Sequence, residues 1–195
     1  MAAPQFDQPR TFRQIQIDRI TSRLGAVVPV IALVVLAARA LLAPTNVALG
    51  KPVRMSSERP GVRAADGLGQ LTPGLAVDGR LPATYDVCTK FEPNPWLLID
   101  LQAPHDLSKI VVHNRADCCW GERELPMLVE GSLDAREFFE LGHRTTPFTQ
   151  RTPWALSVGH ARARYVRVRI PSVEPRELVL SEVEVYGRPI AGAAR

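Results

Sequence analysis

The sequence predicts an all-β domain, a sandwich or a jelly-roll barrel, preceded by a single N-terminal transmembrane helix. From Asn46 onward, short apolar or alternating runs are separated by clusters of Gly, Pro, Asn and Asp, and no long helical period appears. Upstream, one apolar run stands between a polar leader and the domain. With 195 residues, 46% of them apolar, the chain is long enough for one domain of ordinary size plus an appendage.

The N-terminal part divides into a polar leader, residues 1–23, and an apolar run, Leu24–Ala43. As a helix this run is about 30 Å long, which matches the hydrocarbon layer of a bilayer. A cleaved signal peptide is the alternative, because the uninterrupted apolar core Leu24–Ala38 is short. We favour an uncleaved transmembrane span, since the leader is long for a signal peptide and the domain begins almost where the run ends.

The predicted domain covers residues 46–187. Its clearest strands are Trp96–Leu101, Ser108–Asn114, Met127–Ser132, Tyr165–Ile170 and Leu178–Tyr186. In the run that starts at Tyr165, valine and isoleucine alternate with arginine, which predicts one buried face and one wet face. Several short strands with turn signals between them favour a sandwich or jelly roll over a parallel α/β sheet. We expect an irregular loop at Ser57–Gly74 and a loose tail at residues 188–195.

One polar stretch, Asn114–Arg123, has the composition of a binding site. A disulfide between the neighbours Cys118 and Cys119 needs a distorted peptide, because adjacent Cα atoms are only about 3.8 Å apart. Such a bond makes a stiff apolar plate, and Arg115 and Arg123 offer planar forks of donors beside it, a combination that suits a hydroxylated or acidic ligand. The alternative is that both cysteines are reduced and the arginines are paired with the neighbouring carboxylates, Asp117 and Glu122.

Composition and motifs disfavour two classes of function. The net charge of +4 rests almost wholly on arginine, and basic residues are spread along the chain with acidic ones between them. A nucleic-acid-binding protein needs a concentrated basic face with stacking aromatics, so we expect no nucleic-acid partner. The four histidines are scattered, and no nucleophile stands in a local catalytic signature, so we expect no enzymatic activity.

The stretch Asn114-Arg115-Ala116-Asp117-Cys118-Cys119 resembles the Asn-Arg-x-Asp-Cys-Cys turn of fucolectins, a lectin branch of the discoidin (coagulation factor type C) domains. The likeness covers roughly Asn46–Tyr186. It includes the opening Asn46–Pro52, the turn Ala76–Gly79, the strand from Trp96 and the ending Leu180–Tyr186. This resemblance implies an antiparallel β-sandwich jelly roll whose ligand loops cluster at one end.

The resemblance also implies a ligand site, with two departures from the family pattern. A fucolectin histidine that joins the two arginines on the sugar is replaced here by Lys90, and Trp120 is an extra residue after the cysteine pair. The implied ligand-binding residues are Lys90, Arg115, Cys118, Cys119, Trp120 and Arg123. Three cationic side chains lead us to expect a preference for acidic over neutral sugars. The family's disulfide partner of Cys88 falls at Ser181, so Cys88 is either a buried free thiol or pairs with an unidentified group.

A structural cation, Ca²⁺, is implied in the same way. Asp78 and Glu182 stand where fucolectins place two carboxylate ligands, and the backbone oxygens of Leu75, Arg80, Val87 and Ser181 are expected to complete the shell. Hard cations prefer such oxygen ligands. The alternative is that Asp78 caps its own turn and Glu182 is merely exposed.

Together these observations predict a membrane-anchored module that binds a glycan or a surface polysaccharide. Positive charges flank the apolar run on both sides, so charge alone does not orient it. A disulfide-bearing domain belongs in an oxidising compartment, which places the leader in the cytoplasm and the domain in the periplasm or outside the cell. The alternative is an accessory subunit of a larger membrane complex with a vestigial sugar site, favoured by small residues such as Gly25 and Ala32 in the span.

Overall fold

A computed structural model describes residues 29–36, 43–61, 71–117 and 122–190. The chain divides into two compact units, Met1–Ala43 and Pro44–Arg195. In the first unit, residues 29–36 form a helix, while the predicted leader and most of the predicted span lie outside the described residues. None of the helices in the described residues combines the length and the apolar character that a membrane span requires.

The second unit is an antiparallel β domain. Its elements are β1 (Thr45–Asn46), β2 (Val53–Met55), the 3-10 helix η1 (Pro73–Val77), β3 (Val87–Cys88), β4 (Trp96–Asn114), β5 (Met127–Ser132), β6 (Phe139–Arg144), β7 (Trp154–Arg169) and β8 (Val179–Pro189). The strands are hydrogen-bonded in the order β1-β8-β4-β7-β5-β6, with β2 added beside β4 and β3 beside β8. Every strand pair in the described domain is antiparallel, which agrees with the predicted fold class.

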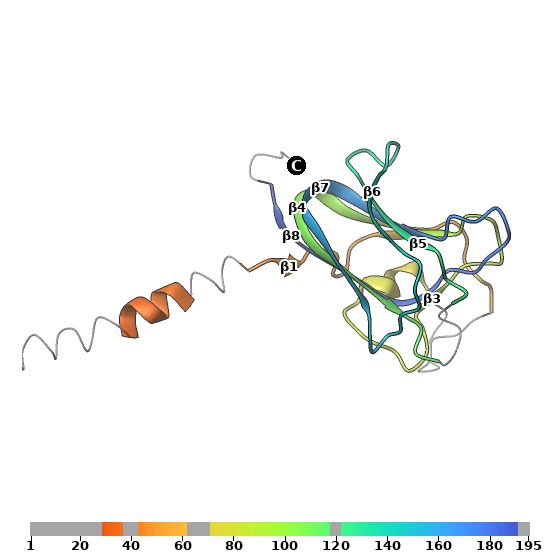
Figure 1. Cartoon of the computed structure of the whole chain (residues 1–195), viewed down its shortest axis with the longest axis horizontal. Coiled ribbons are helices and arrows are strands. Elements are labelled where there is room, and N and C mark those ends of the chain that lie inside the picture. Colours follow the sequence, from red (N-terminus) through yellow and green to blue (C-terminus); the bar gives the residue numbers. More distant parts are fainter. Residues whose placement is uncertain (1–28, 37–42, 62–70, 118–121, 191–195) are drawn as a thin grey trace, which may run out of the picture. The chain divides into compact units, whose positions relative to one another are not determined.

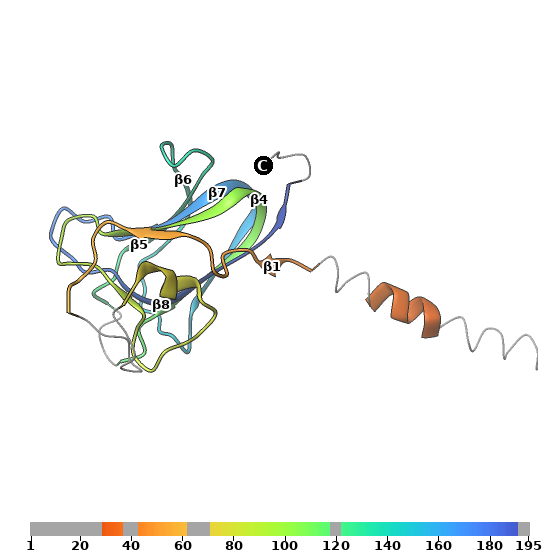
Figure 2. The same cartoon turned by 180° about the vertical axis from the view of Figure 1, so that it is seen from behind.

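The long strands β4 and β7 run side by side through a corner that folds the sheet over on itself (Figures 1 and 2). Their register shifts between the pairs Asp100–Tyr165 and His105–Ala163. At the corner Gln102 adopts a left-handed backbone with φ of 69°, and its N–H donates to Asp100 Oδ1 at 2.8 Å. An irregular ladder of this kind lets one strand leave one layer and enter the other.

One apolar core lies between the two layers. Leu97 and Ile99 precede the corner, whereas Ile110 and Val112 follow it, yet all four are fully buried in the same cluster. Strand alternation delivers these side chains to one face, and burial of each is worth about 1.5–3 kcal/mol before the entropic cost of ordering the chain. The domain is therefore a sandwich made largely by bending two strands.

Most strands were predicted from the sequence, but several predicted strand ends differ from those in the structure. Met127–Ser132 is confirmed residue for residue. The two separate strands predicted between Trp96 and Asn114 are one strand, because the intervening residues continue through the corner. Arg188 and Pro189, predicted to be tail, belong to β8, since they pair with Asp106 and His105 of β4.

Three loops that matter for function leave the sandwich at the end opposite the corner. They join β3 to β4, β4 to β5 and β7 to β8. Both ends of β4 lie there, because its first residue, Trp96, pairs with Arg169 at the end of β7, and its last, Asn114, pairs with Leu180 near the start of β8. Residues far apart in sequence are thereby gathered at this loop end.

Candidate functional site

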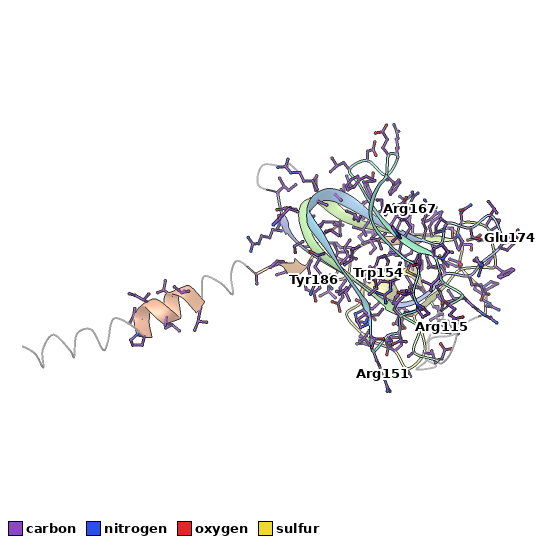
Figure 3. All side chains as sticks on the ribbon, in the orientation of Figure 1. Arg115, Arg151, Trp154, Arg167, Glu174 and Tyr186 are labelled. Carbon is purple, nitrogen blue, oxygen red and sulfur yellow. The ribbon has the colours of Figure 1, made fainter. Side chains whose placement is uncertain are left out.

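A pocket of about 450 Å³ opens among these three loops. It is lined by Phe91 of the β3–β4 loop, by Arg115, Arg123 and Glu124 of the β4–β5 loop, and by Glu174, Pro175, Arg176 and Glu177 of the β7–β8 loop. Figure 3 shows Arg115 and Glu174 at the end of the domain away from Tyr186, whose neighbour across the strand pair is Asn46 of β1. The two predicted arginines, Arg115 and Arg123, therefore line a single cavity.

Backbone hydrogen bonds tie two of the pocket's loops together. Glu92 N–H donates to the carbonyl of Arg176 at 3.0 Å, and Arg176 N–H donates back to the carbonyl of Glu92 at 2.8 Å. The neighbouring residue Phe91 is 69% exposed, so its ring presents an apolar surface to the pocket instead of packing in the core. The pocket thus combines a fixed backbone with an exposed aromatic face.

Arg115 is held in place by Asp117 and by the ring of Tyr85. Its Nε donates to Asp117 Oδ1 at 2.6 Å and its Nη2 to Asp117 Oδ2 at 2.7 Å, while its guanidinium carbon lies 5.0 Å from the centre of the Tyr85 ring. The hydrogen bonds from Arg115 keep the pKa of Asp117 below its usual value. This pairing confirms part of the alternative stated from the sequence. It leaves other guanidinium N–H groups of Arg115 for a ligand.

Glu124 is one of the pocket residues that sequence reasoning missed, together with Phe91 and the lining residues of the β7–β8 loop. It is 1% exposed, and its Oε1 lies 4.0 Å from Arg115 Nη1. Its Oε2 has no hydrogen-bond partner among the described residues. Burial raises its pKa to about 7, although Arg115 opposes the shift. Nothing in the run of alternating charges around Glu124 signals that this carboxyl, and not Glu122, is the buried one.

The expected excess of positive charge is not found in the described lining of the pocket. Its three arginines are matched by three glutamates, and Asp117 adds a further negative charge beside Arg115. Lys90 is exposed and does not belong to that lining; its N–H donates to Ser57 Oγ at 2.9 Å. The other predicted ligand residues, Cys118, Cys119 and Trp120, lie outside the described residues.

Cys88 is a buried free thiol, one of the two outcomes expected from the sequence. Its Sγ donates to the carbonyl of Thr89 at 3.3 Å, and burial raises the pKa of the thiol. Ser181 lies where the register of β4 and β8 shifts, and its hydroxyl donates to the carbonyl of Asn114 at 3.0 Å. The serine therefore fixes the end of β4, from which the Arg115 loop departs.

The two predicted carboxylate ligands lie in an acidic cluster, with Asp78 at the end of η1 and Glu182 in β8. Glu182 is 1% exposed, so the alternative of an exposed Glu182 is wrong. Its Oε1 accepts from Gly79 N–H at 3.0 Å, whereas its Oε2 has no partner among the described residues. Burial and the nearby charges of Asp78, Glu184 and Asp86 raise the pKa of Glu182 to about 8.

The structure defines only part of the remaining coordination shell that was expected for Ca²⁺. Asp78 Oδ1 accepts from Arg80 N–H at 2.8 Å, as the capping alternative predicts. Leu75 lies in η1, and Val87 pairs with Leu180 next to Ser181. Within the described residues no group of three or more His, Cys, Asp or Glu side chains forms a metal cage, so a cation here would depend on backbone oxygens. A buried, unpartnered carboxylate oxygen among other carboxylates fits such an ion.

Comparison with known proteins agrees with the observed fold. Residues 75–168 match the family model described as an F5/F8 type C, NedA-like, galactose-binding domain. The β domain therefore resembles F5/F8 type C domains of the galactose-binding-like class, and fucose-binding lectins are among its structural neighbours. No curated protein matches the sequence significantly.

Three solved structures illustrate the likeness. The lectin domain of lectinolysin, solved with Lewis b antigen, is 26% identical with a TM-score of 0.59, over 72% of this chain and 95% of that one. A fucose-binding module of Streptococcus pneumoniae is 25% identical with a TM-score of 0.58, over 73% and 97%. The serum fucolectin of striped bass, Morone saxatilis, is 23% identical with a TM-score of 0.62, over 75% and 49%, and shows the fold alone.

Proposed function

We propose that this protein is a carbohydrate-binding module held at a membrane, with its ligand pocket at the loop end of the β domain. The observation that carries the proposal is the convergence of Arg115 and Arg123 on one cavity of about 450 Å³. The likeness to lectin domains of similar length supports the same conclusion.

The pocket has the chemistry that sugars require. Sugar rings present hydroxyl groups around their edge and apolar C–H groups on their faces. Guanidinium N–H groups suit the hydroxyl oxygens, and Arg115 is oriented in advance by Asp117, which reduces the entropy lost on binding. Phe91 and Pro175 offer apolar surface to a ring face. Because its charges are balanced, the pocket at neutral pH suits neutral sugars at least as well as acidic ones.

A structural cation belongs to the proposal as well. Asp78 and Glu182 would bind Ca²⁺ through their side chains, with backbone oxygens of Leu75, Arg80, Val87 and Ser181 completing the shell. The buried Oε2 of Glu182, which has no described partner, supports this assignment. The ion would neutralise the acidic cluster and fasten the turn after η1 to β8, next to the strand end that leads into the Arg115 loop.

Membrane attachment is proposed from the sequence. The apolar run Leu24–Ala43 is long enough to cross a bilayer, and β1 begins at Thr45, directly after it. With the leader in the cytoplasm, the binding pocket is displayed in the periplasm or outside the cell. No observation on the described domain favours the accessory-subunit alternative.

A glycan array under non-reducing conditions tests the sugar-binding proposal. We expect wild type to bind a restricted set of glycans, with Lewis b and other fucosylated sugars included as probes. Arg115→Ala and Arg123→Ala should each lose at least tenfold in affinity, about the value of one charge-assisted hydrogen bond. Arg136→Ala, an exposed arginine on the β5–β6 hairpin, is the matched control. If wild type binds no glycan, or the pocket variants bind as well as the control, the pocket is not a sugar site.

A further inference from the structure

Glu124 is unusual among the pocket's charges because it is enclosed. Its side chain is 1% exposed, whereas Glu174, also in the lining, is exposed. One oxygen lies 4.0 Å from Arg115 Nη1, and the other has no hydrogen-bond partner among the described residues. A buried carboxylate without a full set of partners is costly, so such a group usually has a role beyond stability.

We propose that Glu124 determines which sugars the pocket accepts, because gain or loss of one proton on its buried carboxyl changes the charge beside Arg115 by one unit. This inference rests on the proposed function of the pocket. When Glu124 is ionised, it offsets the charge of Arg115 and disfavours a ligand carboxylate. When it is protonated, that offset disappears, and an acidic sugar such as a sialic acid or a uronic acid gains affinity relative to a neutral sugar.

The groups around Glu124 place this switch near neutral pH. Arg115 favours its ionised form, as does a hydrogen bond with Asn114 at the end of β4, while Asp117 opposes ionisation. The β7–β8 loop brings Arg176, Glu174 and Glu177 to the same pocket, and Arg123 adjoins Glu124 in sequence. Burial outweighs these influences and raises the pKa of Glu124 to about 7. Arginine keeps its charge throughout this range.

Affinity measurements at pH 5.5 and pH 8 test the switch. Wild type is titrated with two probes that differ in charge, a neutral fucosylated glycan and its sialylated counterpart. We expect the ratio of acidic to neutral affinity to fall by about tenfold from pH 5.5 to pH 8, the effect of one unit charge several ångströms from the ligand at a partly exposed site. Glu124→Gln should keep the low-pH ratio at both pH values. Glu174→Gln, which removes an exposed carboxylate from the same pocket, should retain the change with pH.

A second measurement does not depend on any ligand. A folded-state pKa of about 7 against 4.5 for an ordinary glutamate means that the folded protein binds this proton more tightly than the unfolded chain. The contribution of Glu124 to the free energy of unfolding is therefore greatest below pH 4.5 and declines as the pH rises through 7. The difference in unfolding free energy between wild type and Glu124→Gln should change across this range.

The outcomes separate the two proposals. In one outcome, wild type and Glu124→Gln both bind sugars, and the ratio of acidic to neutral affinity changes with pH in the same way. That result overturns the role of Glu124 but is consistent with the sugar site. If the difference in unfolding free energy between wild type and Glu124→Gln is constant between pH 4.5 and 8, the role of Glu124 is also overturned, because Glu124 then has no raised pKa. Absence of binding to any glycan at either pH overturns the sugar site, and the role of Glu124 with it.

Discussion

Arg115 and Asp117, two residues apart in one loop, form a bidentate ion pair with N–O distances of 2.6 and 2.7 Å. The pair explains how a loop side chain keeps one orientation without being buried in the core. Two parallel hydrogen bonds fix the guanidinium plane as well as its position. The geometry of the pocket therefore depends on a carboxylate that is not itself part of the pocket lining.

Asp117→Asn should weaken glycan binding while leaving the fold intact. An amide cannot accept both hydrogen bonds of the arginine fork, so Arg115 would sample several orientations. We expect at least a fivefold loss of affinity and a change in melting temperature no larger than that of Glu140→Gln, an exposed carboxylate on β6. Isothermal titration with the best glycan from the array and a thermal melt provide the two readouts. Unaltered affinity would show that Arg115 does not need this partner.

Ca²⁺ should stabilise the domain through Glu182. At a fixed pH of 7.5, addition of Ca²⁺ to chelator-treated protein should raise the melting temperature in proportion to the logarithm of free Ca²⁺ above the dissociation constant. Glu182→Gln should abolish most of this rise, because it removes the buried anionic ligand. Glu184→Gln, which alters the neighbouring carboxylate that accepts from the Tyr186 hydroxyl, is the control and should keep it. A melting temperature that is the same with chelator and with Ca²⁺ would argue against a bound ion.

Among the carboxylates on the outer face of the β5–β7 pair, Glu130 should be the one whose replacement lowers the free energy of unfolding most. Its side chain is only 8% exposed, and it accepts from Arg167 Nε at 2.7 Å and from Arg169 Nε at 3.0 Å. Glu130→Ala leaves two arginines without their partner, so we expect a loss of about 3 kcal/mol in the free energy of unfolding, measured with urea. A loss below about 1 kcal/mol, the size for an exposed pair, would show that water replaces the contact.

Glu130 also makes the stability of the domain depend on pH in the acidic range. Burial acts to raise the pKa of Glu130, but the hydrogen bonds from Arg167 and Arg169 outweigh it and hold the pKa below its usual value of 4.5. A depressed pKa contributes stability that is fully present above pH 4.5 and is lost as the pH falls through the folded-state value. The gap in unfolding free energy between wild type and Glu130→Gln should therefore narrow between pH 5 and pH 3.

Membrane attachment has a direct test on the full-length chain. We expect the protein to stay with the membrane fraction in high salt, to be released by mild detergent, and to keep Met1 in the mature form, as measured by mass spectrometry. A chain that begins at Pro44 should be released without detergent, because it lacks the apolar run. A mature N-terminus at Pro44 in the full-length protein would instead identify the run as a cleaved signal.

The sequence predicted the part of β7 in which valine alternates with arginine, Tyr165–Arg169, because the period of two directly reflects a sheet with one buried face. It did not predict the corner in β4, because the proline and polar residues there are typical of a loop. Arg115 and Arg123 were predicted as ligand residues from their motif, and both line the same pocket. Glu124 was not found, because its burial depends on loops that lie about 50 residues apart in sequence and meet only in the fold.

The position of β8 as the last strand of the described domain has a consequence for folding. β8 is the strand that pairs with β1, β3 and the second half of β4, so one layer of the sandwich cannot close before Val179–Pro189 is available. During synthesis, this layer stays incomplete until Val179–Pro189 has left the ribosome, and β4 keeps an open edge until then. Pairing across such long sequence separations is slow. A nascent chain stalled just before Val179 should therefore be sensitive to protease, and one extended beyond Pro189 by the length of the ribosomal tunnel should be resistant.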